Sequence, residues 1–123
     1  MALAEVSALD LSRAFDRVEA MKAEALAVTA QVDYVLAPAT GVAGFPAEAL
    51  APDPEDILSV ATWTAAFNQT GQPAAVVRAG FDERGLPVGL QVIGPRHDDL
   101  GVLRVAAAYE AAAEPGLPWP DPV

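Results

Sequence analysis

The feature that most constrains the fold is a pair of apolar segments with strand character, separated by a short polar turn. The first runs from Ala74 to Phe81 and the second from Leu86 to Gly94, with Asp82-Glu-Arg-Gly85 between them. Two such runs joined by a short loop containing glycine are typical of a β-hairpin. Because side chains alternate between the faces of a strand, the second segment presents Val88, Leu90 and Val92 on one face and Gly89, Gln91 and Ile93 on the other. Both faces are apolar enough that we expect both to be covered.

A long amphipathic helix is predicted before the hairpin. Ser7 followed by Asp10 has the spacing of a capping box at a helix start. Apolar residues then recur at intervals of three and four, which places them on one side of a helix. They are Leu11, Phe15, Val18, Met21, Ala25 and Val28. We call this set the Leu11–Val28 stripe, and we expect it to be buried against another surface.

Between these elements the sequence predicts a strand, a loop and a second helix. The apolar run Asp33–Pro38 is closed by proline, which favours a short strand buried on both faces. Residues 39–54 are rich in proline, glycine and alanine, as in a surface loop or lid. A helix over 57–67 would place Trp63 and Phe67 in the core, and Gly71 would follow as a left-handed cap.

A last helix completes one folded unit. Asp98 or Asp99 is expected to cap it, and it should continue to about Ala113 because Pro115 and Gly116 follow. The predicted class is therefore α/β, with a mixed β-sheet that contains the hairpin and is covered by helices. The predicted order is helix-strand-helix-strand-strand-helix. Residues 1–114 would form the folded unit, and residues 115–123 an extended or disordered tail.

Charge and composition exclude several functions. Seventeen acidic and seven basic residues give a formal net charge of −10, which would repel a nucleic-acid backbone. The chain has no cysteine and a single histidine, His97, so we predict no disulfide, no metal site and no cofactor. No signal peptide is recognisable, and no apolar run approaches the ~18 residues that a membrane span requires. A cytoplasmic protein that binds neither nucleic acid nor membrane is expected.

The stretch from Phe67 to Glu110 resembles the C-terminal signature of the amidase-signature family. The matching residues are Asn68, Thr70, Gly71, Pro73 and Ala74, then Ala79-Gly-Phe81, then Gly85-Leu-Pro-Val-Gly-Leu-Gln91, then Gly94 and Asp98. Upstream, Asp33-Tyr-Val-Leu-Ala-Pro38 is similar to a strand of that family that also follows a long helix. The resemblance covers nearly the whole chain, and it implies an α/β fold with a mixed sheet covered by helices.

The resemblance also implies a chemistry for which this chain lacks the residues. Members of the family hydrolyse or transfer carboxamides with a serine nucleophile, a second serine, a lysine and backbone N–H groups that stabilise the oxyanion. Those side chains lie upstream of the matched region in the family. Here the only serines are Ser7, Ser12 and Ser59, none in a glycine-rich turn, and the only lysine is Lys22. We therefore expect no catalytic residue in this chain and no activity of the chain alone.

Four residues are candidates for shaping a substrate pocket or its turns. Asn68, Thr70 and Gly71 form a turn in which side chains can bond backbone groups. Arg78 stands where the family usually has proline, and it is read either as a solvated edge position or as a contact for an anion or carboxylate. His97 is interpreted as part of a surface turn, because no nucleophile is near it in sequence.

Two classes of function remain open. The chain is either a segment of an amidase, whether an expressed fragment, a truncated gene product or one half of a split enzyme, or a non-catalytic interaction or structural module derived from one. In the first case its partner is the missing N-terminal catalytic segment. In either case the isolated chain is expected to form a homo-oligomer, most simply a two-fold dimer through the Leu11–Val28 stripe or the 74–94 strands.

Overall fold

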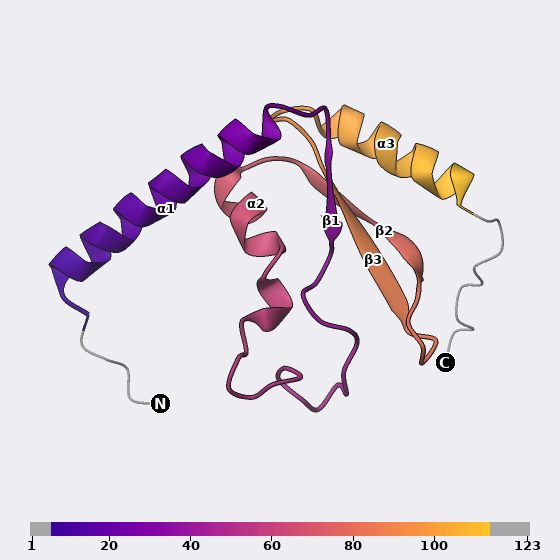
Figure 1. The fold of residues 1–123 in the computed structure, drawn as a ribbon, viewed down its shortest axis with the longest axis horizontal. Coiled ribbons are helices and arrows are strands. Elements are labelled where there is room, and N and C mark those ends of the chain that lie inside the picture. The colour runs from indigo at the N-terminus through magenta and orange to yellow at the C-terminus, as the bar shows by residue number, and fades with distance from the viewer. Residues whose placement is uncertain (1–5, 114–123) are drawn as a thin grey trace.

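The structure of the chain, a computed structural model, describes residues 6–113 and contains three α-helices and one three-stranded sheet (Figure 1). The elements are α1 (Ala8–Thr29), β1 (Val35–Pro38), a short 3-10 helix at Ser59–Ala61, α2 (Thr64–Thr70), β2 (Ala74–Phe81), β3 (Pro87–Ile93) and α3 (Asp99–Ala112). The predicted α/β class and element order are confirmed. The tail predicted over 115–123 lies outside the described residues.

The sheet has the order β1-β3-β2, so the second strand of the hairpin is central. Both pairings are antiparallel, with Val77 opposite Leu90 in the hairpin and Ala37 opposite Gln91 on the other side. The hairpin turn closes as predicted, because the Asp82 N–H donates to the Leu86 carbonyl at 2.8 Å. Within residues 6–113 no parallel pairing is present, so the mixed sheet that the resemblance implied is represented here by antiparallel strands alone.

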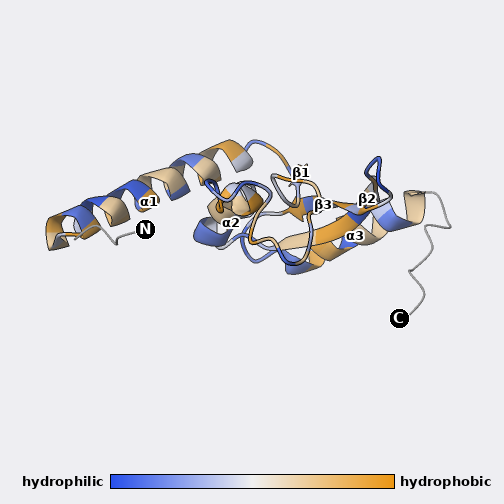
Figure 2. Ribbon diagram, turned by 90° about the horizontal axis from the view of Figure 1, so that it is seen from below, coloured by the Kyte–Doolittle hydropathy of each residue, from blue (hydrophilic) through white to orange (hydrophobic). Residues whose placement is uncertain are grey.

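The core lies between the sheet and α3. Helix α3 packs against β2 and β3, and Figure 2 shows it along one side of the sheet. Among the buried apolar residues, Val77 and Val92 share one face of the hairpin and Val102 and Ala106 lie on α3, whereas Ile93, next to Val92 on β3, points to the opposite face. Val88 is exposed toward the hairpin tip, and Val76 is exposed on the face of β2 opposite Val77. The expectation that both faces of the hairpin are covered is therefore wrong at these positions, because α3 covers only part of one face.

Helix α1 begins as predicted but is not packed as predicted. The Ser7 hydroxyl accepts from the Asp10 N–H at 3.1 Å, which completes the capping box. No residue of α1 is buried, and Leu11 and Phe15 are 52% and 63% exposed. Figure 1 shows why: α1 extends away from the sheet as an arm, and its contact is with the short helix α2. The expected burial of the Leu11–Val28 stripe therefore does not occur within residues 6–113.

Strand β1 also departs from the prediction. Ala37 is buried, but Leu36 on the opposite face is 57% exposed, so the strand is not buried on both faces. The strand stands at the sheet edge with β3 as its neighbour, and helix α3 packs on β2 and β3 instead. A continuous apolar run predicts two covered faces only where layers exist on both sides.

The second helix is shorter and later than predicted. It begins at Thr64 instead of Ile57, and a 3-10 turn precedes it. The Ser59 hydroxyl donates to the Asp56 carbonyl, and the Thr62 hydroxyl donates to the Ser59 carbonyl. These local bonds compete with regular helix formation. Trp63 precedes the helix and is 46% exposed, so its expected place in the core is wrong.

Candidate functional site

The turn between α2 and β2 holds two of the four predicted site residues. Thr70 is fully buried, and its hydroxyl donates to the Phe67 carbonyl at 3.0 Å. Its own carbonyl accepts from Arg96 Nε at 2.7 Å, which ties this turn to the segment before α3. Gly71 has φ 67, the left-handed cap that the sequence predicted. A residue with a Cβ is strained in this conformation, so the turn requires glycine.

The next residue, Gln72, was not recognised from the sequence. Its Nε2 donates to the Gly94 carbonyl at 3.0 Å and to the Thr29 hydroxyl at 3.3 Å. It therefore joins the end of α1 to the end of β3. Its Oε1 is buried and has no hydrogen-bond partner among the described residues. A hollow of about 460 Å3 adjoins it, lined by Leu26, Thr29, Ala30, Val32, Gln72, Pro95 and Arg96.

A second junction fixes the start of α3. Asp98 caps the helix by accepting from the Gly101 N–H at 3.1 Å, as predicted, and it also accepts from the Tyr34 hydroxyl at 2.7 Å. The hydrogen bond to this carboxylate, followed by burial, raises the pKa of Tyr34 above 10.0. His97, in the turn just before the cap, is exposed, as expected for a surface turn, and adopts φ 69.

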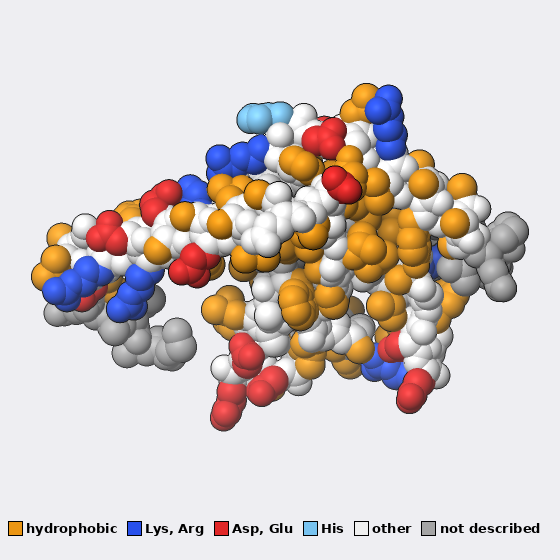
Figure 3. All heavy atoms as spheres, turned by 45° about the horizontal axis from the view of Figure 1, so that its top comes forward, with side chains coloured by type: hydrophobic (Ala, Val, Ile, Leu, Met, Phe, Trp, Pro, Cys, Tyr) orange, Lys and Arg blue, Asp and Glu red, His pale blue; other side chains and the backbone are white. Residues whose placement is uncertain are grey.

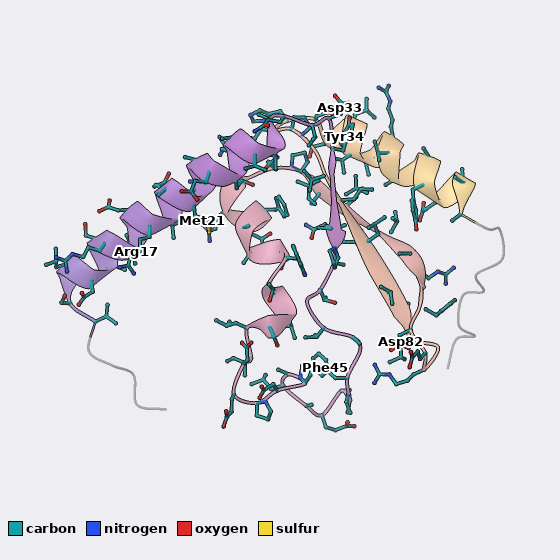
Figure 4. All side chains as sticks on the ribbon, viewed as in Figure 1. Arg17, Met21, Asp33, Tyr34, Phe45 and Asp82 are labelled. Atoms are coloured by element: carbon teal, nitrogen blue, oxygen red, sulfur yellow. The ribbon has the colours of Figure 1, made fainter. Side chains whose placement is uncertain are left out.

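A hollow of about 610 Å3 lies between the loop after β1 and the hairpin. Its lining is mostly apolar and comprises Pro38, Thr40, Gly41, Val42, Ala43, Gly44, Phe45, Val60, Asp82, Pro87, Val88 and Gly89. Figure 4 places Phe45 on the loop and Asp82 at the hairpin tip. Glycine and apolar residues dominate the wall, so the hollow suits an uncharged group.

One arginine on the hairpin turn links the two sides of this hollow. Arg84 donates to the Gly44 carbonyl at 2.6 Å and to the Asp82 carboxylate at 2.8 Å. The Leu86 N–H also donates to Asp82, and this backbone bond, with Arg84, lowers the pKa of Asp82 below 3.8. The hairpin turn therefore also holds the 39–45 loop in place, through the bond from Arg84 to the Gly44 carbonyl.

The other two predicted site residues, Asn68 and Arg78, take no part in the hydrogen bonds described for the α2–β2 turn. Asn68 is exposed on α2. Arg78 is half-buried on the edge strand β2, opposite Gly89, with its guanidinium 5.4 Å from the centre of the Phe81 ring. The structure therefore brings Thr70 and Gly71 together at one junction and leaves Arg78 on another part of the sheet.

The candidate nucleophiles are engaged locally. The Ser7 hydroxyl donates to the Asp10 carboxylate, the Ser59 hydroxyl bonds a backbone carbonyl, and Lys22 Nζ pairs with Glu19 at 2.9 Å. Over residues 6–113, no three metal-ligating side chains gather in one place. Within the same range, no helix has the length and apolar character needed to cross a membrane.

Comparison with known proteins places these elements in a family. A profile of the amidase family matches residues 2–103. The glutamyl-tRNA(Gln) amidotransferase A subunit of Thermodesulfovibrio yellowstonii is 36% identical over 89 residues, which is 72% of this chain. The profile match over residues 2–103 spans α1, β1, α2, β2, β3 and the start of α3. The chain belongs to the amidase family.

Solved structures agree with this assignment. The glutamyl-tRNA(Gln) amidotransferase A subunit from Thermotoga maritima superposes with a TM-score of 0.66 at 33% identity, covering 85% of this chain and 23% of that one. A crystal structure of an amidase gives a TM-score of 0.73 at 26% identity over 86% of this chain and 25% of that one. This chain spans 18% of the Thermodesulfovibrio relative. It therefore corresponds to a small part of a much larger enzyme.

Proposed function

We propose that this chain is the C-terminal part of a hydrolase that cleaves carboxamide C–N bonds, and that it is inactive without the segment that carries the serine–serine–lysine triad. The observation that carries this proposal is the family match over residues 2–103 in a chain whose only lysine is paired with Glu19. An activated serine needs a base within hydrogen-bond reach, and Lys22 lies on the α1 arm with a carboxylate partner. The partner in this proposal is the N-terminal catalytic segment.

The role of the chain in the complete enzyme would be to shape the wall of the active site. The hollow between the 39–45 loop and the hairpin is held by Arg84 and lined mainly by apolar groups. Asn68, Thr70, Gly71 and Arg78 remain the proposed pocket-shaping or turn-shaping residues. Of these, Thr70 and Gly71 would act by fixing the α2–β2 turn, since Thr70 is buried.

A chimaera tests this proposal. The chain replaces the matched quarter of the solved amidase, and ammonia release from simple amides is measured. The truncated amidase without any replacement is the control, and this chain alone is the second control. We expect activity in the chimaera and none in either control. A folded but inert chimaera would contradict the proposal and favour the non-catalytic module.

The chain alone gives a separate test of the missing triad. Turnover that survives purification and disappears on changing Ser7, Ser12 or Ser59 would show that the nucleophile lies in this chain. We expect no release of ammonia above buffer, because the Ser7 and Ser59 hydroxyls are already engaged in helix and turn bonds. The non-catalytic alternative is favoured by one observation, the exposed apolar stripe of α1, which suits a protein surface.

A transfer RNA appears in the names of the relatives, but the charge of this chain argues against the same interaction here. Its net charge is −10, and Figure 3 shows acidic side chains beside the basic ones on the visible face. We therefore propose that it does not bind nucleic acid. Titration with tRNA at two salt concentrations tests this. A micromolar complex that weakens as salt rises would overturn it.

A further inference from the structure

The α1 arm, defined as residues 8–21, is an apolar surface that the described part of the chain leaves open. The half-buried residues of α1 lie mostly toward its C-terminal end, as Lys22, Ala25, Leu26 and Thr29, next to α2. Leu11, Phe15 and Met21 are exposed on the arm. Figure 3 shows hydrophobic side chains along this arm between charged ones. A surface of this kind is typical of an interface between helices.

We propose that the α1 arms of two copies of this chain pair antiparallel about a two-fold axis between Ala14 and Phe15. This register sets Leu11 opposite Val18 of the second copy, and Ala14 opposite Phe15 of the second copy. The small side chain of alanine leaves room for the phenylalanine ring, and the two-fold axis makes each contact twice. The pattern of apolar residues is thus complementary to itself when one helix is reversed.

The charges beside the stripe favour the same antiparallel direction. Asp10 and Arg17 are seven residues apart, so they lie on the same side of the helix, roughly 80–100° from Val18. Reversal of the second helix brings Asp10 of one copy near Arg17 of the other, with an offset of about 3 Å along the axis. A long arginine side chain reaches over that distance. In a parallel two-fold pair, Asp10 of one copy and Arg17 of the other would instead lie on opposite sides of the seam and about 10 Å apart along the axis.

Arg17 has no ion-pair partner among residues 6–113, so its charge is available for this contact. Figure 4 shows Arg17 and Met21 on the arm. The pairing would therefore neutralise two arginines and bury the exposed part of the stripe in one step. It does not depend on whether the chain takes part in amide hydrolysis.

The hairpin edge is the weaker candidate for pairing. Strand β2 lies at the sheet edge, but its register with β3 is interrupted between Arg78 and Gly80, and Gly80 has φ 147. A bulge and a charged side chain on an edge strand are common means of preventing edge-to-edge association. The α1 arm carries no comparable irregularity.

Size-exclusion chromatography with light scattering on the 123-residue chain tests the pairing. We expect a dimer at tens of micromolar and a monomer on dilution. Phe15→Glu should raise the dissociation constant at least about tenfold, because the substitution places a carboxylate in the apolar contact. Ala20→Glu is the matched control, since it adds the same charge on the opposite side of the helix and should leave the constant within about twofold.

Two outcomes would overturn the proposal. One is a strictly monomeric wild-type chain over the micromolar range, which would leave the arm to a different partner. The other is a dimer unchanged by Phe15→Glu but lost with Leu90→Arg, which would place the contact at the sheet. Circular dichroism of each variant shows whether a loss of mass reflects dissociation or unfolding.

The absence of cysteine permits a test of direction and register. Ala14→Cys should form an intermolecular disulfide on mild oxidation, because position 14 lies next to the proposed axis. Leu11→Cys alone should not, but a mixture of Leu11→Cys and Val18→Cys should form the mixed disulfide. Cross-linking of Leu11→Cys with itself as fast as Ala14→Cys would show parallel pairing and overturn the antiparallel register.

Discussion

Helices α1 and α3 share similar caps but differ in packing. Each begins with a side chain that accepts a backbone N–H, Ser7 in α1 and Asp98 in α3. Helix α1 has 22 residues and the clearer apolar stripe, yet none of its residues is buried. Helix α3 has 14 residues and a less one-sided pattern, yet Gly101, Val102 and Ala106 are buried against the sheet.

The difference shows that an apolar stripe identifies a contact surface without identifying its partner. Helix α3 follows β3 after a short turn and returns over the strands that precede it, so its partner is local in sequence. Helix α1 comes first, and its main contact with another described helix or strand is with α2, which has seven residues. Stability should therefore depend strongly on α3 and weakly on the α1 arm, and each prediction below tests this contrast.

The largest effect is expected for Gly101→Ala at the start of α3. A Cβ at this position would overlap Asp98 and the Tyr34 hydroxyl, which form the cap junction. Overpacking of a constrained site costs about 3 kcal/mol, so the free energy of unfolding should fall by about that amount. Urea denaturation measures it. A change below about 1 kcal/mol would show that the junction can relax and that α3 is held less tightly than we infer.

The second prediction compares the two helices directly. Val102→Ala removes a nearly fully buried side chain from α3 and should cost about 2 kcal/mol. Phe15→Ala removes a larger side chain from the exposed arm and should cost less than about 0.5 kcal/mol in the monomer at high dilution. Leu103→Ala, at a 60% exposed position of α3, is the control for helix propensity. Equal costs at Val102 and Phe15 would refute the contrast.

The third prediction concerns a helix that depends on its own cap. Ser7→Ala removes the hydroxyl that accepts the Asp10 N–H but keeps the backbone N–H that donates to the Asp10 carboxylate, and it should destabilise α1 by about 1 kcal/mol. Because α1 packs mainly on α2, and its hydrogen bond with Gln72 lies at the far end of the helix, the loss should remain local. Amide hydrogen exchange should become faster over residues 8–21 and remain unchanged in β3 and α3. Faster exchange throughout the sheet would show that α1 and the core unfold together.

The smallest effect is a pH dependence at the hairpin tip, remote from both helices. The folded state lowers the pKa of Asp82, so its ionised form contributes stability above the unfolded value near 3.8. That contribution is lost as the pH falls through the lower folded pKa. The Asp82→Asn variant should already lack this stabilisation at pH 7. Its free energy of unfolding should therefore not show the decrease that the titration of Asp82 causes in the wild-type chain as the pH is lowered. An identical acid profile in both proteins would contradict it.

The sequence determined the local features of this protein. The hairpin, the capping box at Ser7, the Asp98 cap and the left-handed Gly71 were all predicted, because each depends on residues within a few positions of one another. The amidase resemblance was also readable and is confirmed by the family match. Thr70 and Gly71 were identified as a structured turn, although their role in a pocket remains a prediction.

Only the tertiary structure decided which apolar surfaces are covered. The sequence treated Leu36, Trp63 and the α1 stripe as buried, and all three are largely exposed. The contacts made by Gln72 and Tyr34 were missed for the same reason, since their partners lie 22 to 64 residues away. Burial depends on which segments meet in space, and a periodic pattern records only that a residue prefers to leave water.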